Sequence, residues 1–214
     1  DERADATLVV YNANDPEAHD IAVYYAAARG IAEERLCPIT MPRGFHASAA
    51  EVRGARSSIV NDCFCSVLGM NAPTPCDVSN LDAVVAGLPI SHLVMIRGFP
   101  ARMTGTGWPT DNEDPSVDFY LSYLLANDQD IFAEDTKGNL YLQYPYVATN
   151  KAMSPALDPK EHGYFAIARV QAMTAERTLD LIDRTLASEA KGLQGNIVSE
   201  TTSDKMANVP GQYL

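Results

Sequence analysis

Polar and charged side chains follow the apolar runs of this sequence, at the points where strands are expected to end. Four of them stand out: Asn12, Asp15, Arg97 and Arg169. Ligands of parallel α/β sheets bind beyond the C-terminal ends of the strands, so these four are candidate ligand-binding residues. The two arginines are suited to a carboxylate or another anion. The favoured alternative is structural: each arginine pairs with Asp15 or Asp118 and ties a loop down, because charges beside a sheet edge are usually paired.

An acidic, oxygen-rich segment offers a second kind of chemistry. Asp111, Asp114 and Asp118 lie in or next to a segment rich in Gly, Pro, Asp and Asn. Hard cations such as Ca²⁺ take ligands of this type, so these three residues are candidate metal ligands and Ca²⁺ is the candidate cofactor. The spacing does not match an EF-hand loop, and a solvated acidic loop is therefore the favoured interpretation.

Nucleophilic catalysis requires a nucleophile, a base and an orienting group in one place. The histidines are His19 on an expected helix, His46 and His162 in expected loops, and His92 at the start of an expected strand. None of the four cysteines follows a strand, and the sequence contains no GxSxG, P-loop, HExxH or GxGxxG motif. The sequence therefore predicts no complete catalytic site within these 214 residues.

Strands and helices alternate along the chain and must position these residues. Apolar, β-branched runs predict strands at 7–11, 35–41, 92–96, 164–170 and 195–199, with a further candidate at 141–147. Helical spacing and capping signals predict helices at 16–29, from 49 to about 67, at 80–87, 117–125 and 175–190. Asp15 is the expected cap of the first helix and Gly30 its stop, Ser48 and Glu51 form a capping box, and Thr174 caps the last helix. Residues 103–115 are expected to form a loop.

This alternation predicts an α/β fold: a doubly wound, mostly parallel sheet with helices on both faces, in a three-layer, flavodoxin- or caspase-like arrangement. The length of 214 residues and the 46% hydrophobic content suit a single domain spanning 1–214. A strand near the end of the chain has no helix after it. We therefore expect the chain to be the N-terminal part of a longer protein.

The charge and the apolar content of the sequence limit the kinds of partner that the chain is expected to bind. The formal net charge is −12, from 16 Lys and Arg against 28 Asp and Glu, and no basic cluster offsets it. A nucleic-acid backbone would be repelled, so nucleic acid is not an expected partner. No run approaches the roughly 20 apolar residues of a membrane span.

Four cysteines, Cys37, Cys63, Cys65 and Cys76, indicate a disulfide and hence an oxidising compartment. We predict a bridge from Cys63 or Cys65 to Cys76, across the loop 69–75. The alternative for Cys63 is a buried free thiol, because it lies on the apolar stripe of its helix.

Several segments together resemble an uncharacterised family of bacterial exported proteins. They are 8–12 (LVVYN), 21–25 (IAVYY), 29–31 (RGI), 97–100 (RGFP), 117–121 (VDFYL), 168–174 (ARVQAMT) and 181–195 (LIDRTLASEAKGLQG). They are similar in order to its "IAxYY…RxIP", "RGxP", "VDxxL" and "TRLDGxT…LVDRALxAExxGLxG" motifs. Ala32 departs from the usual proline, and Gln171 and Ala172 from the usual Asp-Gly. The resemblance implies an α/β fold, export and a chain that continues past Leu214. A looser, fold-level likeness is to gingipain-type peptidases of the caspase-like class, whose catalytic His and Cys follow the last two central strands.

These observations lead to three functional hypotheses. The first is a non-catalytic exported domain, secreted, periplasmic or on the cell surface, that binds a protein partner or self-assembles. The second is the N-terminal portion of a caspase- or gingipain-like cysteine hydrolase whose catalytic residues lie beyond Leu214. The third is a cation-dependent enzyme that uses the loop 111–118.

Overall fold

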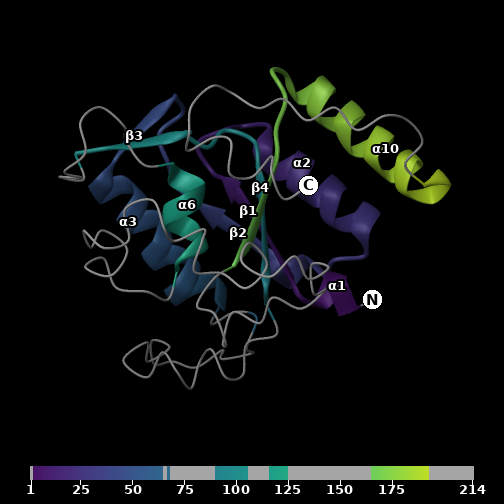
Figure 1. Ribbon diagram of the computed structural model, residues 1–214, viewed down its shortest axis with the longest axis horizontal. Helices are drawn as coiled ribbons and strands as arrows, with labels where there is room; N and C mark the ends of the chain where they lie inside the picture. Colours follow the sequence, from purple (N-terminus) through teal and green to yellow (C-terminus); the bar gives the residue numbers. More distant parts are fainter. Residues whose placement is uncertain (1, 65–66, 68–89, 106–115, 125–164, 193–214) are drawn as a thin grey trace, which may run out of the picture.

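A four-stranded parallel sheet forms the centre of the molecule (Figure 1). The computed structural model describes residues 2–64, 67, 90–105, 116–124 and 165–192. The strands β1 (Thr7–Asn12), β2 (Leu36–Ile39), β4 (His92–Ile96) and β6 (Ala166–Val170) run in the order β2-β1-β4-β6. Every pair is parallel. The predicted α/β class with a mostly parallel sheet is confirmed; the elements predicted at 80–87, 141–147 and 195–199 lie outside the described residues.

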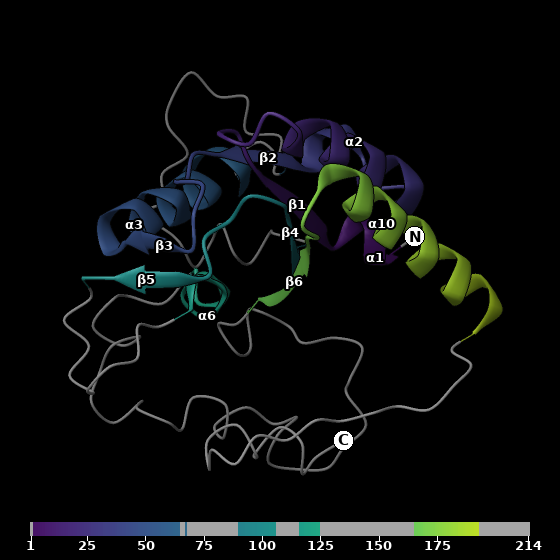
Figure 2. The ribbon, with the colours of Figure 1, turned by 90° about the horizontal axis from the view of Figure 1, so that it is seen from above.

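The central strands β1 and β4 are buried because helices cover the side chains on both of their faces, whereas no residue of β6 is fully buried, contrary to the buried strand expected there. Leu8 and Val10 join one core cluster with helices α3 (Ala49–Ser58) and α6 (Val117–Ser122). Val9, which points the other way, joins a second cluster with α2 (Ala18–Arg29) and α10 (Ala175–Lys191). Successive residues of a strand face opposite sides, so a continuous apolar run is required when helices pack on both. Figure 2 shows α2 and α10 on one side of the sheet and α3 and α6 on the other.

The first long helix begins later than its capping signal predicts. Asp15 is not the cap of α2: the N-cap is Glu17, and its side chain makes no capping hydrogen bond. Asp15 instead accepts a hydrogen bond from the Glu17 backbone N–H, at 3.1 Å, and forms a turn before the helix. The predicted end is confirmed, since Gly30 adopts φ 66° at the C-cap. A short helix α1 (Glu2–Asp5) precedes β1, and the 3-10 turn η1 (Glu33–Arg35) precedes β2.

The capping box before α3 is confirmed. Ser48 Oγ accepts from the Glu51 N–H, and the Glu51 carboxylate accepts from the Ser48 N–H. After Ser58 the same helix widens into the π-helix η2 (Ile59–Phe64), which buries Cys63 against the sheet.

The predicted disulfide exists, but with a different partner. Cys63 is bonded to Cys37 of β2, with the two Cα atoms 5.5 Å apart, so a bridge from Cys63 to Cys76 is wrong. Cys37 lies on the face of β2 that η2 covers, and this long-range contact cannot be deduced from cysteine spacing. Cys65 and Cys76 lie outside the described residues.

A second, two-stranded parallel sheet pairs β3 (His46–Ser48) with β5 (Arg102–Thr104). His46 and residues 103–104 were therefore wrongly predicted as loop. The short strands show no clear alternation; pairing with each other and burial of Ala47 and Met103 make them strands. Helix α10 follows its predicted cap, with Thr174 Oγ1 accepting from the Arg177 N–H, and α6 has a cap that was not predicted, with Ser116 Oγ accepting from the Phe119 N–H.

Candidate functional site at the carboxyl edge of the sheet

The strand order places a topological switch point between β1 and β4. From β1 the chain moves to β2 on one side and then crosses to β4 on the other. Ligands of doubly wound sheets bind at such a point, beyond the carboxyl ends of the strands. Asn12 ends β1 and Asp15 follows it, Arg97 follows β4, and Arg169 lies one strand farther along on β6.

Asn12 is fully buried and joins the ends of three strands. Its side-chain nitrogen donates to the Met41 carbonyl at 3.1 Å and to the Gly98 carbonyl at 2.6 Å. Its side-chain oxygen accepts from the backbone N–H groups of Met41 and Asn14, both at 3.1 Å. These four bonds use the full capacity of the amide, so Asn12 fastens the segments after β2 and β4 to β1.

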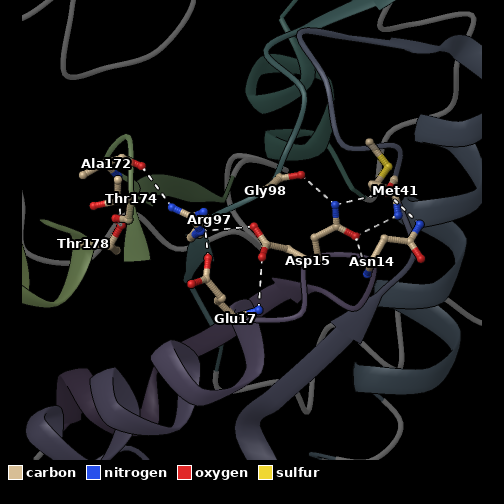
Figure 3. Close-up of polar contacts among 10 residues, drawn as sticks. Asn14, Asp15, Glu17, Met41, Arg97, Gly98, Ala172, Thr174 and Thr178 are labelled. Atoms are coloured by element: carbon tan, nitrogen blue, oxygen red, sulfur yellow. Dashed lines mark hydrogen bonds and ion pairs between the residues drawn. The ribbon is translucent and has the colours of Figure 1, made fainter. Parts of the chain in front are cut away.

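Arg97 links the end of β4 to the start of α2 and to the segment after β6 (Figure 3). Its Nε donates to Asp15 Oδ2 at 3.2 Å, and one terminal nitrogen donates to Glu17 Oε2 at 3.0 Å. The other terminal nitrogen lies 3.4 Å from the Ala172 carbonyl. Asp15 is buried, and a buried carboxylate requires such a partner.

The backbone at this point is unusual. Arg97 has φ 27°, the one positive φ among the described non-glycine residues, and Gly98 has φ 84°. A Cβ on Gly98 would lie 2.8 Å from the Asp15 Cβ, so glycine is required for the close approach of the two segments. A backbone of this kind persists only where the surrounding contacts hold it, as Asn12 and Asp15 do here.

Arg169 makes a comparable set of contacts on the opposite face. Its Nε lies 2.8 and 2.7 Å from the two Asp118 carboxylate oxygens. Its terminal nitrogens donate to the carbonyls of Phe99, at 3.0 Å, and Pro100, at 2.6 Å. Arg169 therefore ties α6 and the segment after β4 to β6.

The geometry thus brings Asn12, Asp15 and Arg97 together and gives each of them internal partners. The two pairings weighed from the sequence, Arg97 with Asp15 and Arg169 with Asp118, are both present. An anion approaching Arg97 would meet the negative charges of Asp15 and Glu17 and would have to displace them.

The candidate metal ligands are not assembled in the described part of the chain. Asp118 accepts from Arg169 with both oxygens, and Asp111 and Asp114 lie outside the described residues. Among the residues described, no group of three or more His, Cys, Asp or Glu side chains could hold a metal ion.

The described histidines lie apart from one another. His19 is on α2 beside Asp20, His46 is on β3 against the ring of Phe45, and His92 is at the amino end of β4. Burial lowers the pKa of His92, with Arg3 as a second cause, and its Nδ1 lies 2.8 Å from Ser91 Oγ. His162 lies outside the described residues.

Sequence reasoning missed two participants in this network. Glu17 was expected to lie within a helix, and Thr178 on α10 was not singled out, yet Thr178 Oγ1 accepts from the Ala172 N–H at 3.1 Å. Because the sequence predicts Asp15 as the cap, the helix is expected to begin at residue 16, which places Glu17 inside it. For Thr178, the sequence signal was its position four residues after the capping residue Thr174.

Comparisons with protein-family models, with curated proteins and with solved structures find no match to this chain. None of the described helices has the length and apolar character needed to cross a membrane.

Proposed function

We propose that this chain is a domain of an exported bacterial protein, secreted, periplasmic or on the cell surface, that binds a protein partner or self-assembles. In this proposal the carboxyl edge of the sheet is a rigid framework that holds the surrounding loops. Chemistry is not carried out by the residues at this edge.

One observation carries the proposal: the polar groups at the switch point bond to one another. Asn12 makes four hydrogen bonds to the backbone, and Arg97 binds two carboxylates and a carbonyl. A reaction centre needs side chains that can exchange protons or partners with a substrate. Here each exchange would break a contact that holds two segments of the fold together.

The disulfide supports the part of the proposal that concerns export from the cytoplasm. Cys37 and Cys63 are both buried and bridge β2 to η2. Structural disulfides form and persist in oxidising compartments and are rare in the cytosol.

The cysteine hydrolase remains the second candidate, because one observation favours it. The parallel order β2-β1-β4-β6 is compatible with the first four strands of a caspase-like sheet. The described strands of this sheet are followed by Thr40, Ala13, Arg97 and Gln171, none of which is a His or a Cys, and the hypothesis assigns the catalytic pair to residues past Leu214.

Fractionation of the native bacterium tests export. Free thiols are alkylated before lysis, and the peptides that contain Cys37 and Cys63 are analysed by mass spectrometry. We expect the oxidised pair in the periplasmic, surface or culture fraction. Recovery from the cytoplasm with both thiols alkylated would contradict the proposal.

Two measurements on the full-length gene product separate binding from hydrolysis. The first is labelling by a peptide electrophile that reacts with activated cysteine thiolates, with urea-denatured protein as the control for adventitious reaction. The second is sedimentation velocity before and after chemical crosslinking in intact cells. We expect no labelling of the native protein and a defined crosslinked complex or oligomer. Stoichiometric labelling of one native cysteine would favour the hydrolase.

A further inference from the structure

Helix α10 is attached to the molecule very differently at its two ends. In its first half Thr178 and Ile182 are buried, and Leu179 packs against the cluster under α2. After Ile182 no residue of the helix is buried, and only Leu186 is half-buried. The second half, residues 183–191, is called the distal segment here.

The first half is anchored by hydrogen bonds of the buried Thr178 side chain as well as by packing. Thr178 Oγ1 donates to the Thr174 carbonyl at 2.9 Å and accepts from Ala172 N–H at 3.1 Å. Ala172 in turn lies within hydrogen-bond distance of Arg97. The start of α10 is therefore continuous with the framework at the switch point.

The distal segment is held on α2 by two polar contacts at the surface. Both terminal nitrogens of Arg29 donate to the Glu189 carboxylate, one of them at 2.8 Å. Tyr24 Oη donates to Asp183 Oδ1 at 2.5 Å. Figure 1 shows the two helices side by side, with the end of α10 at the periphery.

From this asymmetry we infer that the distal segment of α10 is a hinged strap, which opens as a unit about Ile182 while the first half of the helix stays in place, and that the Arg29–Glu189 pair is its catch. Opening withdraws Leu186 from the apolar cluster that also contains Tyr25 and Ala26 of α2. Segments with few buried contacts open locally at a lower free energy than the core. The inference does not depend on the proposed binding function.

Low pH and high salt should weaken the Arg29–Glu189 ion pair. Arg29 and, more weakly, Arg3 of α1 hold the pKa of Glu189 below its ordinary value of 4.5. Tyr25 of α2 also faces the carboxylate, and its own pKa is raised, first by burial. Because the closed-state pKa of Glu189 is depressed, the contact contributes fully above about pH 4.5 and is lost as the pH falls through the lower value. High salt screens an exposed pair in the same direction.

Hydrogen exchange of the full chain at neutral pH, resolved by mass spectrometry, tests the strap. We expect amides of 183–191 to exchange together and at least about tenfold faster than those of 178–182, whose N–H groups are the first with backbone partners in this helix. Glu189→Gln should accelerate exchange of 183–191 a further two- to fivefold and leave 166–182 unchanged. Glu176→Gln, the same chemical change in the first turn, is the matched control and should leave 183–191 unchanged.

The sign of the Glu189→Gln effect separates the strap from ordinary fraying. A negative charge near a helix C-terminus opposes the helix dipole, so its removal should slow exchange in a helix that merely frays. The strap requires the opposite result. Arg29→Gln should reproduce the acceleration, and the double variant should add little to either single change. Slower or unchanged exchange in Glu189→Gln, or uniform exchange along α10, would overturn the inference.

Discussion

Arg97 follows β4 and Arg169 lies near the end of the neighbouring strand β6, and both bind a carboxylate, but at different depths below the surface. The Arg97 side chain is 12% exposed and its partner Asp15 is 2% exposed. Arg169 is 22% exposed and Asp118 is 36% exposed. Both arginines hold the segment after β4 and bind a carboxylate, so the main difference between the two clusters is how far the carboxylate is removed from water.

That difference decides what each arginine contributes. A carboxylate beside solvent can be rehydrated when its partner is lost, whereas a buried one is left without compensation. The Arg97 cluster also includes the strained backbone of Arg97 and Gly98. Two arginines that both bind a carboxylate beside the sheet are therefore expected to contribute differently to stability, mainly because their carboxylate partners are buried to different extents.

The largest expected effect comes from replacing Arg97 by glutamine, with the same change at Arg169 as the comparison. Arg97→Gln should lower the free energy of unfolding by about 3–5 kcal/mol, because it leaves Asp15 buried and unpaired. Arg169→Gln should cost roughly 1–2 kcal/mol, since Asp118 reaches solvent. Urea denaturation of both variants measures the difference. Equal losses would break the comparison.

Loss of the disulfide should cause the next largest decrease in the free energy of unfolding. This decrease should not depend on the Arg97 cluster or the Arg169 cluster. The bridge closes a loop of 26 residues between β2 and η2. Its removal in Cys37→Ala/Cys63→Ala should cost roughly 3 kcal/mol through the entropy of the unfolded chain. Combined with Arg169→Gln, the two losses should add, and a marked departure from additivity would mean that the sites are coupled.

A single methyl group at Gly98 tests how tightly the Arg97 cluster is packed. Gly98→Ala should cost about 2–3 kcal/mol, from the positive φ and from the contact with Asp15. Gly105→Ala is the control, because φ is +72° there but nothing lies within 4 Å of the added carbon. It should cost only about 1 kcal/mol. Thermal denaturation of both variants compares them, and similar shifts in Tm would show that the close approach is unimportant.

The smallest expected effect concerns the Arg169 cluster and calcium. Asp118 already accepts from Arg169 with both oxygens, so added Ca²⁺ must compete with an internal cation. We expect the Tm of the wild-type chain to move by less than about 1 °C in millimolar CaCl₂ relative to chelator, since a ligand raises Tm only by binding the native state. A clear rise, lost in Asp111→Asn and retained in Glu176→Gln, would favour the cation-dependent hypothesis.

Local signals predicted most of the elements correctly. The capping box at Ser48, the cap at Thr174 and the stop at Gly30 each depend on residues a few positions apart. The apolar runs at β1 and β4 were located within one residue, because a strand buried on both faces must be apolar throughout. β3 and β5 escaped prediction, since three-residue strands are too short to show a period.

The candidate site was predicted in part. The sequence correctly placed Asn12, Asp15, Arg97 and Arg169 near the carboxyl ends of strands, and it identified the carboxylates available to the arginines. It wrongly placed Asp15 as a helix cap. A capping signal depends on nearby residues, whereas the residue that binds the Asp15 carboxylate, Arg97, lies 82 positions away in the sequence. The ligand-binding role of the four residues stays a prediction.

By itself, the sequence determined the alternation of strands and helices, the parallel sheet that follows from it, and the capped boundaries of the helices. Only the tertiary structure decided which cysteine bonds to Cys63, how deeply each arginine is buried and which end of α10 is anchored. The physical reason is the distance along the sequence over which each interaction acts. Periodicity and capping act between residues close in the chain, whereas burial and pairing depend on segments that meet only after the sheet has formed.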